Sequence, residues 1–157
     1  MLETTTECVP LKVKANKLHA DAKLPEKNNS SDSGYDFFIV KDSDFNGEVY
    51  VLGAGQRKVF STGISLELPH PFGMLLKDRS GMAVKDGIHV LAGVIDNGYR
   101  GEIKICLINL SDKSRTFSRG QKVAQGILHQ VPCMEIVETD KLSNSDRGSK
   151  GFGSSGK

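Results

Sequence analysis

The chain has 157 residues, with 21 Lys and Arg against 19 Asp and Glu, which gives a formal net charge of +2. This length corresponds to one ordinary domain, and a hydrophobic share of 38% excludes disorder throughout. The near-neutral charge does not favour a nucleic-acid partner, and no apolar run approaches the roughly 20 residues of a membrane span. Since the N-terminus also lacks the layout of a signal peptide, we expect a soluble intracellular protein, cytoplasmic or nuclear.

The three cysteines, Cys8, Cys106 and Cys133, lie far apart without C-x-x-C spacing. An odd number without this spacing argues against a disulfide framework and against a thiolate zinc site. The four histidines also lie in separate segments, with no i, i+4 pair that would indicate a local zinc motif. We therefore expect reduced cysteines, and a metal site assembled only by folding stays open.

Short runs rich in Val, Ile, Phe and Leu repeat about every ten residues between positions 11 and 138. This rhythm predicts an all-β domain of sandwich, barrel or jelly-roll type. Charge alternates with Ile at residues 102–105, the period expected for a strand with one buried face. In chain order, the clearest strand runs are residues 35–40, 48–52, 58–68, 74–77, 89–95, 102–110 and 123–131.

One short helix is predicted at residues 80–86, between the fourth and fifth of these runs. Ser80 can cap its first turn, and Gly87 can end it. Further along, Asn97 and Gly98 form the dipeptide favoured in two-residue type I′ turns. Asp96 and Tyr99 would then flank the tip of a hairpin.

Beyond residue 140 the composition changes, because residues 143–157 are mostly Gly and Ser with three basic residues and one aromatic. Such a segment cannot bury a core, so we expect a β-rich core at residues 1–140 and a flexible tail at residues 141–157. The end of the tail fits P-loop spacing up to its final hydroxyl, but the strand before and the helix after that motif are missing. Closely spaced Gly and Ser with Arg147 and Lys150 favour a phosphate-binding flap, and a solvated terminus is the alternative.

Several polar residues stand where they suit chemistry. Arg79 and Ser80 begin the short helix, where free N–H groups favour a phosphate, although Ser80 could merely cap and Arg79 could pair with Asp78. Asp96 is either a turn-stabilising residue or a positioned general base. Asp36 is either a loop acid or a strand-edge residue, and a lone glutamine at position 125 indicates nothing by itself.

In this order, five segments resemble the signature of the trimeric deoxyuridine triphosphatase (dUTPase) family: SGYDF at 33–37, RSGMAVKDGI at 79–88, GVIDNGYRG at 93–101, RGQKVAQ at 119–125 and RGSKGFGSSG at 147–156. Residues 1–30 and 41–57 carry no motif. The resemblance implies a jelly-roll-like fold and a homotrimer whose three active sites each use segments of all three chains. It also implies Mg²⁺-assisted hydrolysis of dUTP to dUMP and pyrophosphate, which limits uracil in DNA and supplies dUMP for dTTP synthesis.

The resemblance further implies roles for individual residues. Asp96 activates the water that attacks the α-phosphate, Tyr99 packs against the deoxyribose, and the third motif reads uracil through Gly93, Val94 and Ile95. The phosphate chain is lined by Arg79, Ser80, Gly81 and Gln125. The tail closes over it with Arg147, Gly151, Phe152, Gly153, Ser154 and Ser155, of which Phe152 stacks on uracil. Phosphate oxygens and water hold Mg²⁺ without a direct protein ligand, and Asp36 belongs to the network around those waters.

Four positions depart from the family's pattern. Gly98 stands where a second acid is common and Asp78 where Pro or Gly is common, while Ser33 replaces Ala and Gln121 replaces an acid. The nearest enzymatic alternative is a dCTP deaminase, which shares the β core but needs a glutamate in place of Asp96 and is not expected to have the phosphate flap. The other alternative is a nucleotide-sensing module that binds dUTP and docks a protein partner, for which residues 41–57 offer an unassigned surface.

Overall fold

The computed structural model describes residues 11–41, 45 and 47–151, and this part of the chain contains ten strands and one helix. In chain order they are β1 (Lys14–Lys17), β2 (Tyr35–Phe38), β3 (Val49–Leu52), β4 (Arg57–Glu67), β5 (Phe72–Lys77), α1 (Ser80–Asp86), β6 (Ile88–Leu91), β7 (Val94–Ile95), β8 (Glu102–Asn109), β9 (Arg115–Ser118) and β10 (Lys122–Gln130). This order confirms the prediction of an all-β domain with one short helix.

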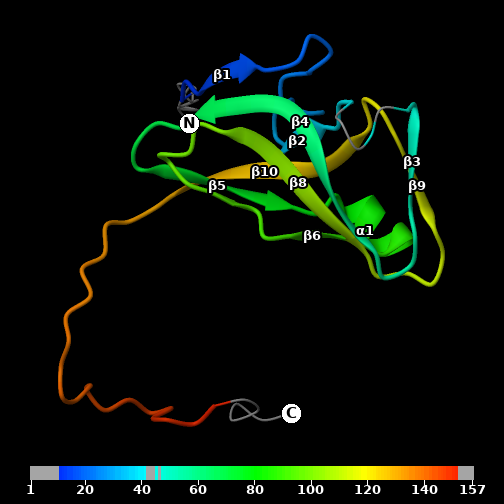
Figure 1. The fold of residues 1–157 in the computed structure, drawn as a ribbon. Coiled ribbons are helices and arrows are strands. Elements are labelled where there is room, and N and C mark those ends of the chain that lie inside the picture. The colour runs from blue at the N-terminus through cyan, green and yellow to red at the C-terminus, as the bar shows by residue number, and fades with distance from the viewer. Residues whose placement is uncertain (1–10, 42–44, 46, 152–157) are drawn as a thin grey trace, which may run out of the picture.

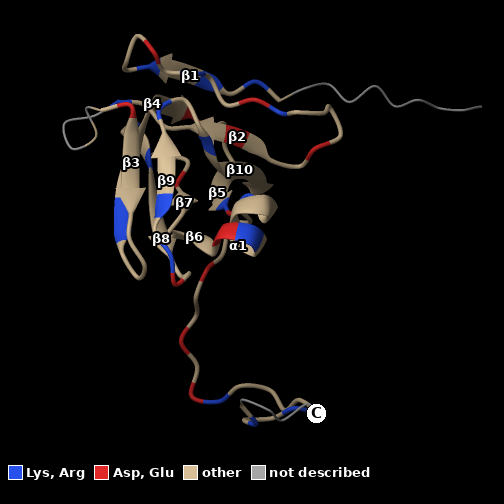
Figure 2. Ribbon diagram, turned by 90° about the vertical axis from the view of Figure 1, so that its right-hand side faces the viewer, with Lys and Arg blue, Asp and Glu red and all other residues tan. Residues whose placement is uncertain are grey.

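Two four-stranded sheets form the body of the molecule (Figure 1). The first sheet has the order β1-β4-β8-β6 and the second the order β2-β10-β5-β7. The strands β3 and β9 form a separate two-stranded ribbon at one edge of the body, and α1 contacts β6 of the first sheet (Figure 2). All of these pairings are antiparallel, so each sheet can bury one face and leave the other to solvent.

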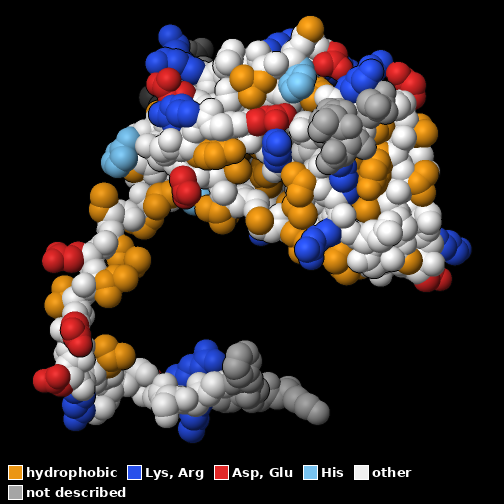
Figure 3. Space-filling model, viewed as in Figure 1, with side chains coloured by type: hydrophobic (Ala, Val, Ile, Leu, Met, Phe, Trp, Pro, Cys, Tyr) orange, Lys and Arg blue, Asp and Glu red, His pale blue; other side chains and the backbone are white. Residues whose placement is uncertain are grey.

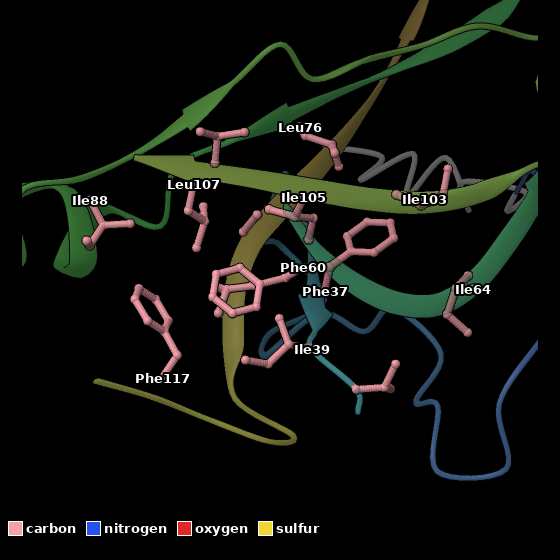
Figure 4. Close-up of a cluster of buried hydrophobic side chains, with 14 of the residues drawn as sticks. Phe37, Ile39, Phe60, Ile64, Leu76, Ile88, Ile103, Ile105, Leu107 and Phe117 are labelled. Atoms are coloured by element: carbon pink, nitrogen blue, oxygen red, sulfur yellow. The ribbon is translucent and has the colours of Figure 1, made fainter. Parts of the chain in front are cut away.

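The hydrophobic core lies between the sheets and is built from alternate residues of the strands (Figure 4). On β8, the side chains of Ile103 and Ile105 are fully buried while Lys104 between them is exposed. This pattern confirms the alternation expected at the start of that strand. From the second sheet, Phe37 of β2 and Leu76 of β5 join the same cluster. Burial of each large apolar side chain contributes about 1.5–3 kcal/mol to the stability of the fold.

Aromatic rings attach the β3–β9 ribbon to the body. Phe60 of β4 has no exposed surface, and its ring lies 5.5 Å from the ring of Tyr50 on β3 in an edge-to-face arrangement. The ring of Phe117 on β9 lies 5.2 Å from the same Phe60 ring, tilted against it by 43°. Edge-to-face aromatic pairs stabilise such contacts beyond the area they bury, so the ribbon is fixed to β4 through one central ring.

The run expected at residues 89–95 is split into two strands that belong to different sheets. The break falls at Ala92 and Gly93, both of which have a positive φ, 60° and 97°. The Gly93 carbonyl oxygen accepts a hydrogen bond from the Leu76 N–H at 2.7 Å, which brings β7 beside β5. The chain therefore crosses from the first sheet to the second at this point.

The helix α1 ends as expected, but its cap lies one residue earlier than predicted. Gly87 adopts the left-handed conformation with φ 68°, and its N–H meets the carbonyl oxygens of Met82 and Ala83. The capping position is held by Arg79, whose carbonyl oxygen accepts the Ala83 N–H at 3.0 Å. The prediction that Ser80 caps the helix is wrong, because Ser80 is already the first helical residue.

After β10 the chain leaves the body as an extended arm, residues 131–151 (Figure 1). Every side chain of the arm is exposed. Four large apolar side chains are between 71% and 84% exposed and appear as hydrophobic patches along the arm in Figure 3: Met134, Ile136, Val137 and Leu142. The division into a core and a tail at residue 140 stays a prediction. No helix among the described residues is long and apolar enough to cross a bilayer.

Candidate active site

A tight turn connects β7 to β8 and places Asp96 at its first position. The Tyr99 N–H donates to the Asp96 carbonyl oxygen at 3.1 Å. The side-chain amide of Asn97 donates to the carbonyl oxygens of Leu68 at 2.7 Å and of Phe72 at 3.4 Å. The turn that carries Asp96 is thereby anchored to the chain around the start of β5.

The predicted type I′ hairpin at this turn is wrong. Type I′ geometry needs a positive φ at both central residues, and neither Asn97 nor Gly98 has one. The strand before the turn pairs with β5, whereas the strand after it pairs with β4 and β6. Because the Asn97 side chain ties the turn to the second sheet while β8 continues in the first, the turn joins two layers.

The ring of Tyr99 folds back over its own turn. Its hydroxyl donates to the Glu102 carbonyl oxygen at 2.9 Å, and the residue stays 43% exposed. The ring can occupy this place because residue 101 is a glycine, since a Cβ on residue 101 would lie 2.5 Å from the Tyr99 hydroxyl oxygen. The ring therefore stands close to the backbone and forms one wall of a hollow.

This hollow, called here the Asp96 hollow, has a volume of about 360 Å³. Its lining includes Gly93, Val94, Ile95, Asp96 and Tyr99, so the structure brings together these five residues that the sequence analysis singled out. A carboxylate at the edge of such a space can hold a water and accept its proton. The aromatic ring and the backbone beside it suit a flat, partly apolar ligand.

A second cavity, the Arg79 hollow, has a volume of about 310 Å³. Its lining includes Asp36, Arg79, Ser80, Gly81 and Gln125, which the sequence analysis also singled out. A guanidinium, a hydroxyl and a carboxamide supply N–H and O–H donors that suit phosphate oxygens. The arrangement can therefore bind an anion with several oxygens.

A chain of ion pairs fixes Arg79 in the Arg79 hollow. The Arg79 Nε donates to Oδ1 of Asp36 at 3.0 Å, and Lys122 Nζ lies 3.1 Å from Oδ2 of the same carboxylate. Lys122 also lies 3.1 Å from Oε1 of Glu26, and its hydrogen bonds to Asp36 and Glu26 raise the pKa of Lys122. Of the five N–H donors of arginine, two are engaged here, one by Asp36 and one by the Lys122 carbonyl oxygen at 3.5 Å, so three can still serve a ligand.

Arg79 thus pairs with Asp36 rather than with Asp78, the alternative partner considered from the sequence. The Asp78 carbonyl oxygen instead accepts a hydrogen bond from Gln125 Nε2 at 2.8 Å. Gly34 leaves room for this glutamine, since a Cβ at that position would collide with Gln125 Oε1. A glycine of the first motif is therefore required by the side chain of the fourth.

The sequence analysis missed Lys122, Glu26 and Asn28 as parts of this site. Lys122 Nζ donates to the Asn28 side-chain oxygen at 3.2 Å in addition to its ion pairs. The available signal was the position of Lys122 inside the fourth motif. To place Lys122 in the site from this signal, one must know the register of β10 against β2, in which Gln125 lies opposite Asp36.

The two hollows are separate in one chain, because they share no lining residue. Neither lining includes a described residue of the arm. Within the arm, Arg147 Nε donates to the Lys150 carbonyl oxygen at 3.2 Å, and Gly151 is exposed. The other tail residues expected to bind phosphate or a base lie outside the described residues: Phe152, Gly153, Ser154 and Ser155.

Comparisons with known proteins agree on one family. The sequence model of the dUTPase family matches residues 20–156. The deoxyuridine 5'-triphosphate nucleotidohydrolase of Hydrogenobaculum sp. (strain Y04AAS1) is 43% identical over 148 residues, which is 93% of this chain and 99% of that protein. The enzyme of the same name from Clostridium tetani is 41% identical over 147 residues, which is 92% of this chain and 97% of that protein.

Solved structures show the same likeness. A Staphylococcus bacteriophage 80alpha dUTPase bound to dUPNHPP superposes with a TM-score of 0.81 at 27% identity. The match covers 92% of this chain and 98% of that one. This likeness confirms the expected jelly-roll-like fold.

Proposed function

This chain belongs to the dUTPase family and hydrolyses dUTP to dUMP and pyrophosphate, and we propose that its two hollows are the two parts of that active site. The observation that carries this proposal is the grouping of Asp96 and Tyr99 around one hollow and of Arg79 and Gln125 around the other. The activity removes dUTP from the pool used for DNA synthesis and supplies dUMP. We place it inside the cell, where deoxynucleoside triphosphates are made and used.

Asp96 is the catalytic base in this proposal. Its carboxylate accepts a proton from a water while the water oxygen forms a bond to the α-phosphorus. The bond from the α-phosphorus to the bridging oxygen breaks, and pyrophosphate leaves with the electron pair. The anchored turn supports this role, because Asn97 fixes the turn from which the Asp96 side chain projects.

Tyr99 and the backbone before Asp96 bind the nucleoside. The ring of Tyr99 would pack against the deoxyribose and leave no room for a 2′-hydroxyl. The backbone of Gly93, Val94 and Ile95 would present its N–H and C=O groups to the edge of uracil. Their shared position in the Asp96 hollow supports this assignment.

Arg79, Ser80, Gly81 and Gln125 bind the phosphate chain. Their common hollow and the ion pair that holds Arg79 support this assignment. Stabilisation of the developing charge by fixed donors is a large term in phosphoryl transfer. The tail, with Arg147, Gly151 and the four residues after it, would close over the phosphates and exclude water.

The lining of the Arg79 hollow fits a Mg²⁺ that arrives bound to the substrate, because N–H and O–H donors can hold the phosphates while the Asp36 carboxylate faces the waters of the metal. Mg²⁺ prefers oxygen ligands and usually keeps several waters when phosphates hold it. The described residues contain no group of three His, Cys, Asp or Glu side chains that could hold a metal ion by themselves. Asp36 has a cation on each oxygen and would reach the metal through its waters. When bound, the metal would neutralise phosphate charge.

We also propose that the working form is a homotrimer with shared sites. The separation of the two hollows in one chain supports this, because a dUTP molecule needs both sets of groups at once. The exposed apolar side chains of the arm, among them Ile136 and Val137, provide a surface that would be covered in an assembly. Each site would then combine an Asp96 hollow and an Arg79 hollow from different chains.

Pyrophosphate release from each deoxynucleoside triphosphate, measured with and without Mg²⁺, tests the proposed substrate and metal. Among these nucleotides, we expect pyrophosphate release only from dUTP, and only when Mg²⁺ is present. Release of ammonia from dCTP without pyrophosphate would instead indicate a deaminase. Binding of dUTP without any turnover would indicate a nucleotide-sensing module.

Asp96→Asn should abolish turnover and leave the affinity for a non-hydrolysable dUTP analogue within about tenfold, because a general base acts mainly in the transition state. Single-turnover kinetics and calorimetric titration measure the two quantities. The matched control is Asp112→Asn, an exposed acid outside both linings, which should retain full activity. A near-normal kcat in Asp96→Asn would remove this residue from the mechanism.

A further inference from the structure

Asp78 stands between β5 and α1, directly before Arg79, and its carboxylate is only 26% exposed. Its two oxygens have different partners on β6. Oδ1 accepts the backbone N–H of Val90 at 2.6 Å, and Oδ2 lies 2.8 Å from Nδ1 of His89. Both contacts join the segment that carries Arg79 to the first sheet.

Val90 needs this acceptor because β6 is an edge strand. In the described part of the chain β6 pairs with β8 on one side only. The N–H of Val90 therefore points away from the sheet, where no neighbouring strand can accept it. The Asp78 carboxylate takes the place of a backbone acceptor, and His89 beside it supplies a second donor.

The backbone of Asp78 makes a contact with the second sheet. Its carbonyl oxygen accepts the hydrogen bond from Gln125 Nε2 on β10 at 2.8 Å. Residue 78 is thus held by its side chain to the first sheet and by its main chain to the second. Arg79 follows directly and lines the same hollow as Gln125.

We propose that Asp78 is a positioning residue for triphosphate binding, which acts through Arg79 and Gln125 and is held in place by Val90 and His89. This inference rests on the proposed function, since it takes Arg79 and Gln125 as ligands of the phosphate chain. Asp78 is not part of the lining of the Asp96 hollow. Its removal therefore weakens binding of the terminal phosphates and leaves binding of the nucleoside part unchanged.

The test compares two ligands on the full-length protein in the presence of Mg²⁺. The imido analogue dUpNHpp carries the full phosphate chain, whereas dUMP lacks the two terminal phosphates. Calorimetric titration of Asp78→Ala should show about a tenfold loss of affinity for dUpNHpp, as expected for loss of hydrogen bonds to charged groups. The affinity for dUMP should stay within about twofold of the wild-type value, because the hydrogen bonds of Asp78 lie away from the groups that bind the nucleoside.

Conservative variants separate positioning from general loosening of the fold. Asp78→Asn keeps an oxygen for Val90 and should recover part of the loss. His89→Asn can place an amide nitrogen near the position of Nδ1 and should bind dUpNHpp better than His89→Ala. The matched control is Asp86→Ala, which removes an acid from the other end of α1, where it lies 3.7 Å from Arg115. This control should bind both ligands as the wild type does.

The inference would be overturned if Asp78→Ala lost affinity for dUpNHpp and dUMP equally, or if it lost affinity for neither. If Asp78→Ala does not fold, His89→Ala and His89→Asn decide, and equal dUpNHpp affinity in those two variants would overturn it as well. Absence of dUTP hydrolysis by the wild-type protein would overturn the proposed function itself. An active wild type whose Asp78→Ala variant keeps its dUpNHpp affinity would overturn only the positioning role.

Discussion

At the scale of single residues, Gly101 decides how closely the Tyr99 ring can approach its own turn. Nothing larger than hydrogen fits there without contact, because a Cβ would lie 2.5 Å from the hydroxyl oxygen and 2.6 Å from Cζ. The hydrogen bond from Tyr99 to Glu102 holds the ring in that position. If the ring excludes the 2′-hydroxyl of UTP, then Gly101 controls sugar discrimination without touching the sugar.

Gly101→Ala should therefore narrow the preference for dUTP over UTP, by about tenfold in the ratio of kcat/KM values. The added methyl pushes the ring outward and leaves space that a 2′-hydroxyl can enter. Steady-state kinetics with both nucleotides measure the ratio. Gly98→Ala is the control, because a Cβ at that position of the same turn meets nothing within 4 Å. An unchanged ratio in a folded Gly101→Ala protein would show that the sugar is read elsewhere.

Ala92 is a second residue with a conformational cost, since its φ of 60° lies in the left-handed region. This region costs a residue with a Cβ about 1–2 kcal/mol, and asparagine tolerates it better than alanine. Ala92→Asn should raise the free energy of unfolding by about 0.5–1 kcal/mol. Urea denaturation at one fixed protein concentration measures this, because assembly would couple stability to concentration.

The control for this prediction is Ala54→Asn, which places the same side chain at an exposed turn residue without a positive φ. It should leave the unfolding free energy nearly unchanged. A loss of stability in Ala92→Asn would mean that the crossing between the sheets tolerates only a small side chain.

At the scale of elements, strands with two different faces could be predicted and strands without that contrast could not. The strand β8 alternates between buried and exposed residues, and its sequence shows this. The strand β1 has the sequence KANK with all four residues exposed, so it carries no hydrophobic signal. It exists because its backbone pairs with β4, with Lys14 opposite Glu67. The short strand β9 buries only Phe117, so its sequence also carries too little hydrophobic signal to predict a strand.

The motifs pointed to individual candidate residues, but they did not predict how those residues are arranged. The motifs named Asp96, Arg79 and Gln125, and the structure places them as two groups. Their division into separate hollows depends on which sheet each strand joins, which local patterns do not encode. The partners of Asp78 were unpredictable for a related reason, because the N–H of Val90 lacks a neighbour only once β6 is an edge strand.

The arm offers a prediction at this scale. Chains that end at Asp146 should unfold at the same temperature as the full protein, because the residues removed bury nothing in the described structure. Their rate of dUTP hydrolysis should fall at least about 100-fold, because in the proposed mechanism the tail supplies hydrogen-bond donors to the phosphates and excludes water. Thermal melting and pyrophosphate release measure the two effects.

Removal of Lys157 alone is the control for this truncation, because the match to the dUTPase family ends at residue 156. That variant should keep full activity. A lower melting temperature in the chains that end at Asp146 would show that the tail is structural.

At the scale of the whole molecule, the separation of the Asp96 hollow from the Arg79 hollow constrains how one dUTP molecule can reach both. One chain carries Asp96, the proposed proton acceptor, in one hollow, and Arg79 and Gln125, the proposed hydrogen-bond donors to the phosphates, in the other. In the proposed homotrimer, a threefold rotation would bring the Asp96 hollow of one chain beside the Arg79 hollow of the next, at three sites at once. The same rotation would give the exposed apolar side chains of each arm a neighbouring chain to contact.

Complementation between two inactive variants tests this arrangement directly. Asp96→Asn keeps a working Arg79, and Arg79→Ala keeps a working Asp96, so each protein should be nearly inactive alone. Neither side chain belongs to the hydrophobic core, so mixed trimers should form when the two are refolded together. If each site takes Asp96 from one chain and Arg79 from another, random mixing at equal amounts gives about one quarter of the sites both wild-type groups.

Activity should then return to about a quarter of the wild-type rate, far above the sum of the two parents. Native mass spectrometry must first show that mixed trimers are present, and wild-type protein refolded with Asp96→Asn serves as the reference for dilution. If Asp96 and Arg79 of one chain served the same site, every site would lack one of the two groups, whatever the mixture. Mixed trimers without recovered activity would therefore show that each site is built within a single chain, and that the two hollows of one chain must come together in the working enzyme.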